Sequence, residues 1–247
     1  MTRSPSCLPL VLLAGSMLLI PACARKQPPP EPRERLDASL IEAVKANRLA
    51  DVKDLLHRGA SPNAFQARTH DGLTALIFAV SEGHQEVVQA LIAGGADVNF
   101  RQYGTFDGLT PLMFAAGTDR PDIVNLLIEH GAKVNRRTDI NGLGPTALNY
   151  AVQGGHIGPV TLLLAEGAAI ECRDLEAAIS GGHVDIAERL FLAGADPCWR
   201  FSGSGAPTLL DQAQRSPKDV RAKMVAMVRA FMGTQRVPDD REGRRQR

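Results

Sequence analysis

Aromatic side chains are scarce in this sequence: they make up 4% of its 247 residues, with one Trp and two Tyr. The strands of a β-sandwich favour aromatic and β-branched residues, so this composition argues against that fold. Alanine, leucine, valine and glycine are plentiful instead, which suits short and closely packed helices. Because 44% of the residues are hydrophobic and 22% are charged, the composition is that of a folded protein and not of a disordered one.

The sequence also lacks an excess of charge of either sign. It holds 28 Lys and Arg against 27 Asp and Glu. Arg3 is the only charged side chain among the first 22 residues, and without it the remainder has 27 charges of each sign. Nucleic-acid binding relies on clustered Lys and Arg, so this balance predicts no nucleic-acid partner.

A hydrophobic run of membrane-spanning length is missing as well. Leu8 to Ile20 form an apolar run of 13 residues, which is too short to cross a bilayer as a helix. With Arg3 before it, the run predicts an export signal over residues 1–22. We therefore expect a protein of a bacterial cell envelope.

The end of the apolar run carries a possible anchor. Leu19-Ile20-Pro21-Ala22-Cys23 resembles the lipobox of bacterial lipoproteins. The resemblance implies that Cys23 is lipidated and becomes the new N-terminus, so that the protein faces the periplasm and touches a membrane only through its lipid. The alternative is ordinary signal peptidase cleavage at Ala22-Cys23-Ala24, which would release a soluble periplasmic or secreted protein.

The chain divides further by composition. Residues 23–35 contain Pro28-Pro29-Pro30 and Pro32 among charged residues, and predict a semi-extended linker behind the lipidated N-terminus. Residues 36–233 hold the repeated pattern described next and are the predicted folded domain. Residues 234–247 are highly charged, and we expect a disordered tail there.

A repeated pattern fills the middle of the sequence. The dipeptide Gly-Ala recurs at spacings of 36, 36, 36 and 27 residues, beginning at Gly59, Gly95, Gly131, Gly167 and Gly194. An apolar segment before each dipeptide carries a Leu at a fixed place: Leu55, Leu91, Leu127, Leu163 and Leu190. An earlier segment of each unit carries Leu-x-x-Ala, starting at Leu40, Leu76, Leu112, Leu148 and Leu175. Each unit is therefore predicted to form two short amphipathic helices, the second more deeply buried.

Turn and cap signals separate these helices. The dipeptide Gly-His stands between them in three units, at Gly83-His84, Gly155-His156 and Gly182-His183. A threonine precedes the first helix in three units, where its hydroxyl can cap exposed N–H groups: Thr74, Thr110 and Thr146. The glycine of each Gly-Ala pair suits the left-handed position that ends a helix.

These units resemble the ankyrin repeat, whose pattern is T-P-L-H-x-A with a period of about 33 residues. The best unit runs from Asp107-Gly108-Leu109-Thr110-Pro111-Leu112 to Gly131-Ala132-Lys133-Val134-Asn135. The resemblance covers about Leu36 to Trp199 and implies an all-α solenoid of about five helix pairs with connecting finger loops. A C-terminal cap is expected from Thr208 to Ala213 and from Val220 to Phe231. The His of the pattern is replaced by Ile77, Met113 and Asn149, which predicts that the hydrogen bond of that His is missing.

The resemblance implies a monomeric protein-binding scaffold, whose binding would inhibit or protect its partner on the concave face. Tyr103 and Phe106 lie in an extended finger, where the family has polar or small residues. Together with Phe100, Arg101 and Met113, they are the predicted partner-binding residues, because aromatics and Arg are enriched at binding hot spots. The alternative role for these aromatics is a small core between fingers. The alternative function is a structural envelope lipoprotein with diffuse contacts.

Catalytic and metal-binding motifs are missing from the sequence. His84, His156 and His183 recur at one place in successive units, so we interpret them as structural; such positions are too far apart for the ~2.0–2.1 Å bonds of one zinc ion. Acidic residues are scattered without a pair that suggests acid–base chemistry, and no Gly-rich phosphate loop is present. The sequence thus predicts no enzyme, no metal and no cofactor.

Cysteine is rare too, with four in the chain. Cys7 lies in the predicted signal and Cys23 is the predicted anchor. Cys172 and Cys198 occupy nearly equivalent places beyond the ends of adjacent repeats. In an oxidising envelope they can form a disulfide if their Cα atoms lie within ~7 Å. Two unpaired thiols are the alternative.

Overall fold

The computed structural model describes residues 32–65, 73–101, 108–138, 144–195 and 209–234. The chain divides at Pro32 into two units, and all of these residues belong to the second. Their secondary structure consists of twelve helices and one isolated antiparallel bridge between Phe65 and Thr74. Among these helices, none combines the length and the apolar character that a membrane span requires.

Ten helices form five consecutive pairs. We call the earlier helix of each pair a first helix and the later one a second helix. The first helices are α1 (Arg33–Lys45), α3 (Ala75–Glu82), α5 (Pro111–Gly117), α7 (Ala147–Gly154) and α9 (Cys172–Gly181). The second helices are α2 (Leu49–His57), α4 (Gln85–Ala93), α6 (Pro121–Glu129), α8 (Ile157–Ala165) and α10 (Val184–Leu192). The pair α11 (Leu209–Arg215) and α12 (Arg221–Thr234) closes the stack.

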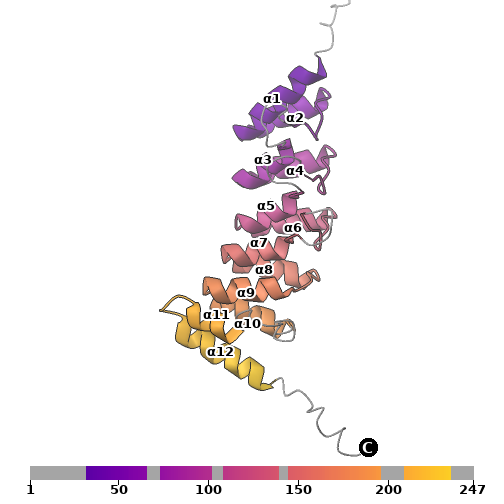
Figure 1. Cartoon of the computed structure of the whole chain (residues 1–247). Helices are drawn as coiled ribbons and strands as arrows, with labels where there is room; N and C mark the ends of the chain where they lie inside the picture. Colours follow the sequence, from indigo (N-terminus) through magenta and orange to yellow (C-terminus); the bar gives the residue numbers. More distant parts are fainter. Residues whose placement is uncertain (1–31, 66–72, 102–107, 139–143, 196–208, 235–247) are drawn as a thin grey trace, which may run out of the picture. The chain divides into compact units, whose positions relative to one another are not determined.

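The pairs lie in a single row within this unit (Figure 1). First helices pack on first helices, from α1 through α3, α5, α7 and α9 to α11, and second helices pack on second helices from α2 to α10. The helix pair α11 and α12 covers the last repeat, where the ring of Phe231 lies 4.0 Å from that of Phe191 between centroids. The expectation of an all-α solenoid of helix pairs is confirmed.

The repeated apolar residues form the core of this stack. The Leu and Ala of each Leu-x-x-Ala segment in the first helices are at most 1% exposed, as are Leu91, Leu127, Leu163 and Leu190 of the second helices. Alanine at the first-helix position lets neighbouring backbones approach closely, while the leucines fill the space between the two rows. Burial of these repeated Leu and Ala side chains supplies the main stabilising free energy of the stack.

Tight turns join the two helices of each pair. Their central residue has a positive φ, between 52° and 76°, in Asn47, Gly83, Asp119, Gly155 and Gly182. The Gly-His pattern predicted three of these turns. The other two use Asn47 and Asp119, since short polar side chains tolerate the left-handed region better than other non-glycine residues.

The first helix begins earlier than predicted. α1 starts at Arg33, inside the segment 23–35 that we expected to be a linker, and Pro32 occupies its N-cap position. A proline at this place ends an extended segment and has no N–H that the helix must satisfy. Arg33, Glu34 and Arg35 are good helix formers, so the helix extends up to the proline.

Side chains in the fingers connect each repeat to the next. The backbone N–H groups of Asp97, Lys133 and Ala169 donate to the Oδ1 atoms of Asn63, Asn99 and Asn135, at 2.8, 2.9 and 2.7 Å. Asn99 and Asn135 also donate from Nδ2 to the carbonyls of Gly131 and Gly167. These asparagines stand at 36-residue intervals, and they fix the spacing between consecutive fingers.

Candidate functional site

One face of the first helices remains open to solvent. In α3 the residues Ala75, Leu76, Ile77, Ala79 and Val80 are buried, and Phe78, Ser81 and Glu82 are not. Positions separated by three and four residues lie on one side of a helix, so these three share a face. The same pattern of exposure recurs in α5, at Phe114, Gly117 and Thr118. We call this surface the first-helix face.

Aromatic rings occupy the centre of the first-helix face. Phe78, Phe114 and Tyr150 stand at the same place in α3, α5 and α7, and each packs partly buried against the core. The ammonium of Lys45 on α1 lies 5.0 Å from the centroid of the Phe78 ring. Burial raises the pKa of the Tyr150 phenol, so its ring remains neutral in ordinary conditions. In α9 the equivalent residue is Ala177, and the aromatic row ends there.

Beside this face, a second row runs through the fingers. Phe65, Arg101, Arg137 and Arg173 all stand six residues after the glycine of a Gly-Ala pair. We call these four residues the finger row. Arg101 donates from Nη2 to the carbonyl of Thr138 in the next finger at 2.6 Å, and Arg137 donates from Nη1 to the carbonyl of Gly144 at 3.2 Å. Phe65 is 58% exposed and forms the bridge to Thr74, the N-cap of α3.

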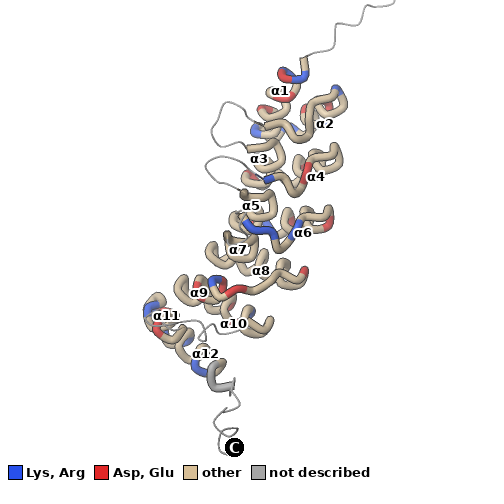
Figure 2. Tube along the Cα trace, turned by 45° about the vertical axis from the view of Figure 1, so that its right-hand side comes forward, with Lys and Arg blue, Asp and Glu red and all other residues tan. Residues whose placement is uncertain are grey.

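A charged cluster lies where the repeat spacing drops from 36 to 27 residues. The two carboxylate oxygens of Glu171 pair with Nη2 of Arg137 and, at 3.1 Å, with Nε of Arg173. Glu171 and Arg137 are partly buried, at 19% and 30% exposed, and Arg173 is exposed at 42%. Figure 2 shows the basic and acidic segments on the connections that lead into α7 and α9.

A buried polar pair, Asn149 and Asp174, is hydrogen-bonded to the backbone of Glu171 in this cluster. The Asn149 side-chain amide donates from Nδ2 to Oδ1 of Asp174 at 3.1 Å, and the backbone N–H of Glu171 donates to Oδ2 at 2.7 Å. Asp174 is fully buried. Burial raises the pKa of its carboxyl, against the opposing effect of these two hydrogen bonds. The pair joins α7 to α9 through the core and is positioned for structure and not for chemistry on a ligand.

One predicted binding residue is misplaced. Met113 was expected to line the partner surface, but it is 2% exposed and lies in the core. Its position falls on the α5 side that packs between neighbouring first helices. Its sulfur accepts a hydrogen bond from the backbone N–H of Thr110 at 3.4 Å. Met113, which stands at the position of the pattern's His, thus bonds the backbone of the N-cap threonine through its sulfur.

The other predicted binding residues have mixed outcomes. Arg101 is partly buried and belongs to the finger row. Phe100 is partly buried as well, and its backbone N–H donates to the carbonyl of Asp97. Tyr103 and Phe106 lie outside the described residues, so their role in partner binding stays a prediction.

The histidines of the repeats contact the preceding repeat. The ring Nδ1 of His84 donates to the carbonyl of Val44 at 3.2 Å, and Nε2 of His156 donates to the carbonyl of Gly117 at 3.1 Å. These bonds close the end of one first helix with a side chain from the next pair. Within the described segments, no group of three His, Cys, Asp or Glu side chains is placed to hold a metal ion.

Three of the four cysteines, Cys7, Cys23 and Cys198, lie outside the described residues. Cys172, the first residue of α9, is exposed and disulfide-bonded. The identity of Cys198 as its partner stays a prediction.

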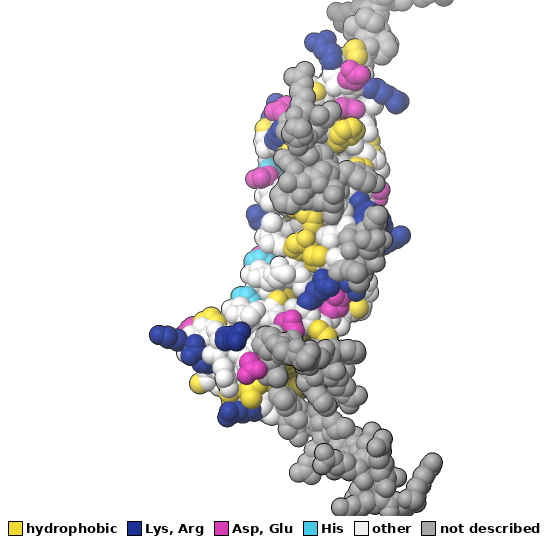
Figure 3. Space-filling model, viewed as in Figure 1, with side chains coloured by type: hydrophobic (Ala, Val, Ile, Leu, Met, Phe, Trp, Pro, Cys, Tyr) yellow, Lys and Arg dark blue, Asp and Glu magenta, His cyan; other side chains and the backbone are white. Residues whose placement is uncertain are grey.

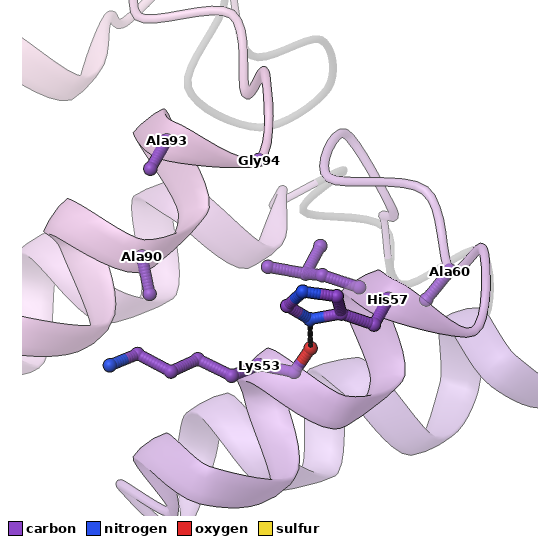
Figure 4. Close-up of a pocket in the computed structure, with 7 residues that line it drawn as sticks. Lys53, His57, Ala60, Ala90, Ala93 and Gly94 are labelled. Carbon is purple, nitrogen blue, oxygen red and sulfur yellow. Dashed lines mark hydrogen bonds between the residues drawn. The ribbon is translucent and has the colours of Figure 1, made fainter.

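Two hollows mark the surface of the described residues. The first, of about 350 Å³, lies between α2 and α4 and is lined by Leu56, Ala90, Ala93 and Gly94, with Lys53 and His57 at its edge (Figure 4). It exists because Ala90, Ala93 and Gly94 are small; Leu126, Glu129 and His130 take their places one repeat later. His57 uses its ring Nδ1 to donate to the carbonyl of Lys53 at 2.7 Å.

The second hollow, of about 380 Å³, continues the first-helix face toward the C-terminus. It is lined by Arg173, Glu176, Ala177, Ser180, Gln212 and Arg215 from α9 and α11. Arg173 of the finger row thus opens onto the same surface as Ala177, the residue equivalent to the three rings. The finger row and the first-helix face are two sides of one surface at this end.

Sequence reasoning overlooked the two rows that define this surface. Phe78, Phe114 and Tyr150 repeat at 36-residue intervals, as do Arg101, Arg137 and Arg173. Our search for the period followed the residues that build the core. The same period, applied to positions that break the apolar pattern, would have identified both rows.

Comparison with known protein families supports the repeat architecture. Residues 40–138 match the family described as ankyrin repeats, in three copies. A search of curated proteins finds none that matches the chain. The matched residues begin within α1 and include α2 to α6, and the same arrangement of helix pairs continues in α7 to α10.

Proposed function

Because residues 40–138 are ankyrin repeats, we propose that this protein binds one protein partner on its first-helix face and holds it at a bacterial cell envelope. The observation that carries the proposal is the row of partly exposed rings, Phe78, Phe114 and Tyr150. A helix that serves only the stack has no need of large rings on its solvent side. Aromatic side chains in partly buried positions are the usual anchors of a protein interface.

The rigid stack explains how such a surface can bind tightly. Each ring is held by the core below it, and consecutive fingers are tied through Asn99 and Asn135. A partner therefore meets side chains that are already in place, and little conformational entropy is lost on binding. Binding at this face would inhibit the partner if it covers an active site there, and protect it otherwise.

Affinity capture from envelope extracts tests the binding proposal. We expect the full chain to retain one stoichiometric protein, and the double variant Phe114→Ala, Tyr150→Ala to lose it. The matched control is Ile157→Ala, Leu192→Ala, which removes two exposed apolar side chains from second helices, 41% and 80% exposed in the wild type. Melting temperatures of all three proteins report any loss of folding.

Two results would contradict the proposal. Retention of the same protein by both double variants would place the interface elsewhere. A diffuse set of proteins, equally retained by all three forms, would favour a structural envelope protein with many weak contacts.

The envelope location rests on the sequence before residue 32 and on one cysteine. The apolar run, the lipobox-like end at Cys23 and the Pro-rich segment after it together suit an exported lipoprotein. The disulfide at Cys172 supports an oxidising compartment. We propose that Cys198 is its partner, since the two cysteines follow adjacent repeats.

Mass spectrometry of the protein purified from cells tests this location. We expect a lipidated N-terminal Cys23, detergent partition of the wild type, and release or incomplete processing of Cys23→Ser. Cys7→Ser is the control and should behave like the wild type. An unmodified N-terminus after Ala24 would instead indicate ordinary secretion. Non-reducing peptide mapping of the same sample identifies the partner of Cys172.

A further inference from the structure

We propose that the segment of the partner that docks on this protein is acidic and apolar, with carboxylates on Arg137 and Arg173 beside apolar side chains on Phe114 and Tyr150. This inference rests on the proposed function and adds the chemistry of the partner. It follows from the placement and charge of two parallel rows of residues. Each row repeats at the spacing of the stack.

The two rows border each other near α7 and α9. Arg173 and Ala177 are one helical turn apart in α9 and line the same hollow. Arg137 is joined to Arg173 through Glu171, and it also bonds Gly144, two residues before the N-cap of α7. Tyr150 lies one turn into that helix. A segment lying along the first-helix face therefore meets rings on one side and guanidinium groups on the other.

The finger side of this surface carries a local surplus of positive charge. The described finger residues 96–101, 132–138 and 168–173 hold five cations, Arg101, Lys133, Arg136, Arg137 and Arg173, against two acids, Asp97 and Glu171. Residues 132–138 contain three of these cations and no acid. The whole chain is nearly neutral, with a formal charge of +1. The surplus is therefore a property of these described finger segments, and it favours an acidic partner.

Arg137 can bind a carboxylate of the partner in addition to its bonds within the stack. Arg137 already stabilises the stack, because it pairs with Glu171 and bonds Gly144. A guanidinium has five N–H donors in a planar fork, however, and can serve a carbonyl, a carboxylate and a second carboxylate together. Its remaining exposure of 30% leaves part of the group open to solvent. Glu171 holds Arg137 and Arg173 together, which preorganises the pair for an incoming carboxylate.

The apolar half of the occupant follows from the rings. Figure 3 shows hydrophobic side chains gathered over the middle of the stack, with basic and acidic side chains just beyond them toward the C-terminal end. The rings of Phe114 and Tyr150 lie in adjacent first helices that pack directly on each other. An aliphatic or aromatic side chain placed between carboxylates would cover both rings while the charges reach the finger row.

Selection from a displayed library of random peptides tests this inference on the full chain. We expect the recovered peptides to be enriched in Asp and Glu, and in aromatic or aliphatic residues, relative to the starting library. The most enriched peptide is then synthesised with blocked ends, as is a version with every Asp and Glu changed to the amide. Binding of each is measured by fluorescence anisotropy.

Variants of the protein test whether Arg137 and Arg173 bind the carboxylates of the peptide. Arg137→Gln, Arg173→Gln should weaken binding of the acidic peptide at least tenfold, and so should the amide version of the peptide on the wild type. The matched control, Lys218→Gln, Arg229→Gln, removes two exposed cations from the C-terminal cap and should change binding less than twofold. Arg137→Lys keeps the charge with less effect on folding. It should weaken binding less than Arg137→Gln at equal melting temperature.

The outcomes separate this inference from the proposed function. Peptides that need Phe114 and Tyr150 but show no acidic enrichment would overturn the inference and leave the proposed function standing. Peptides whose binding ignores Phe114 and Tyr150 would overturn both. A wild-type dimer that dissociates in Arg137→Gln, Arg173→Gln, detected by sedimentation, would make a second copy the occupant and also overturn the inference.

Discussion

The repeats spaced at 36 residues and the repeat that follows at 27 use the same sequence position in different ways. The fourth residue after the glycine of the first four Gly-Ala pairs is Asn63, Asn99, Asn135 and then Glu171. Each asparagine accepts a backbone hydrogen bond from the next finger. Glu171 instead pairs with two arginines and stands at the N-cap of α9. In the shortened unit, ion pairs between side chains therefore take the place of hydrogen bonds from a backbone N–H to an asparagine side chain.

The two regions also differ in what their core contains. The place of Asp174 is taken by Ala75, Pro111 and Ala147 in the three preceding units. Asp174 is the only buried ionisable side chain among the described residues. Among the described residues, the core of the regular region thus holds no ionisable side chain, whereas the junction between α7 and α9 includes buried and partly buried charged groups. We expect the two regions to respond differently to mutation, salt and pH.

The largest effect should come from the shared apolar ladder. Leu127→Ala and Leu190→Ala change equivalent residues, both fully buried, and each should lower the free energy of unfolding by ~2–5 kcal/mol. In a stack with nearest-neighbour contacts, Leu190→Ala should let α9 to α12 unfold before the regular repeats. Hydrogen exchange during urea titration measures both. Identical exchange patterns for the two variants would mean that the stack unfolds as one unit.

The charged cluster should give the next largest effect. Glu171→Gln removes a partly buried carboxylate that Arg137 and Arg173 share, and hydrogen bonds to charged groups contribute about 1.5–3 kcal/mol. We expect a loss in this range, measured by chemical denaturation. The loss should shrink only modestly in high salt, because the carboxylate is 19% exposed. Its disappearance in high salt would show that the pairs are screened like ordinary surface ion pairs.

Loss of an asparagine hydrogen bond in the regular region should lower the free energy of unfolding less than Glu171→Gln does. Asn99→Ala removes one hydrogen bond to Lys133 N–H and one to the Gly131 carbonyl. Neutral hydrogen bonds contribute about 0.5–1.5 kcal/mol each, and exposed groups can bond water instead, so we expect a loss of about 1 kcal/mol. Unlike Glu171→Gln, this loss should not depend on salt. A salt-dependent result would indicate that the finger cations respond to the missing tie.

The smallest effect concerns pH at the buried acid. Burial raises the pKa of Asp174 in the folded protein above its unfolded value of about 3.9. The folded state then binds the proton more readily, so this contribution to stability is full below the unfolded pKa and is lost as pH rises through the folded pKa. The stability of the wild type relative to Asp174→Asn should therefore be greater at about pH 4.5 than at about pH 7.5. An opposite trend would mean that the two hydrogen bonds outweigh burial.

The sequence predicted the buried parts of this fold better than its surface. Leu127 and its equivalents follow a period that the core enforces, because each must fill the same space between two helices. Met113 shows the limit of that reasoning: a family pattern placed it near a binding surface, while helical spacing places it in the core. Phe114 and Arg137 were overlooked because no packing rule requires them, although their 36-residue spacing is visible in the sequence.

The asparagine hydrogen bonds between fingers affect where whole repeats can be gained or lost in this protein. Each asparagine joins one finger to the next, so a duplicated 36-residue unit inserted among the regular repeats would keep an asparagine acceptor before it and a backbone N–H donor after it. The same insertion after Gly167 would separate Arg137 from Glu171 and present the new finger with a carboxylate in place of an amide. Gains and losses of whole repeats should therefore accumulate before Glu171, which fixes the C-terminal boundary of the region that is free to vary in length.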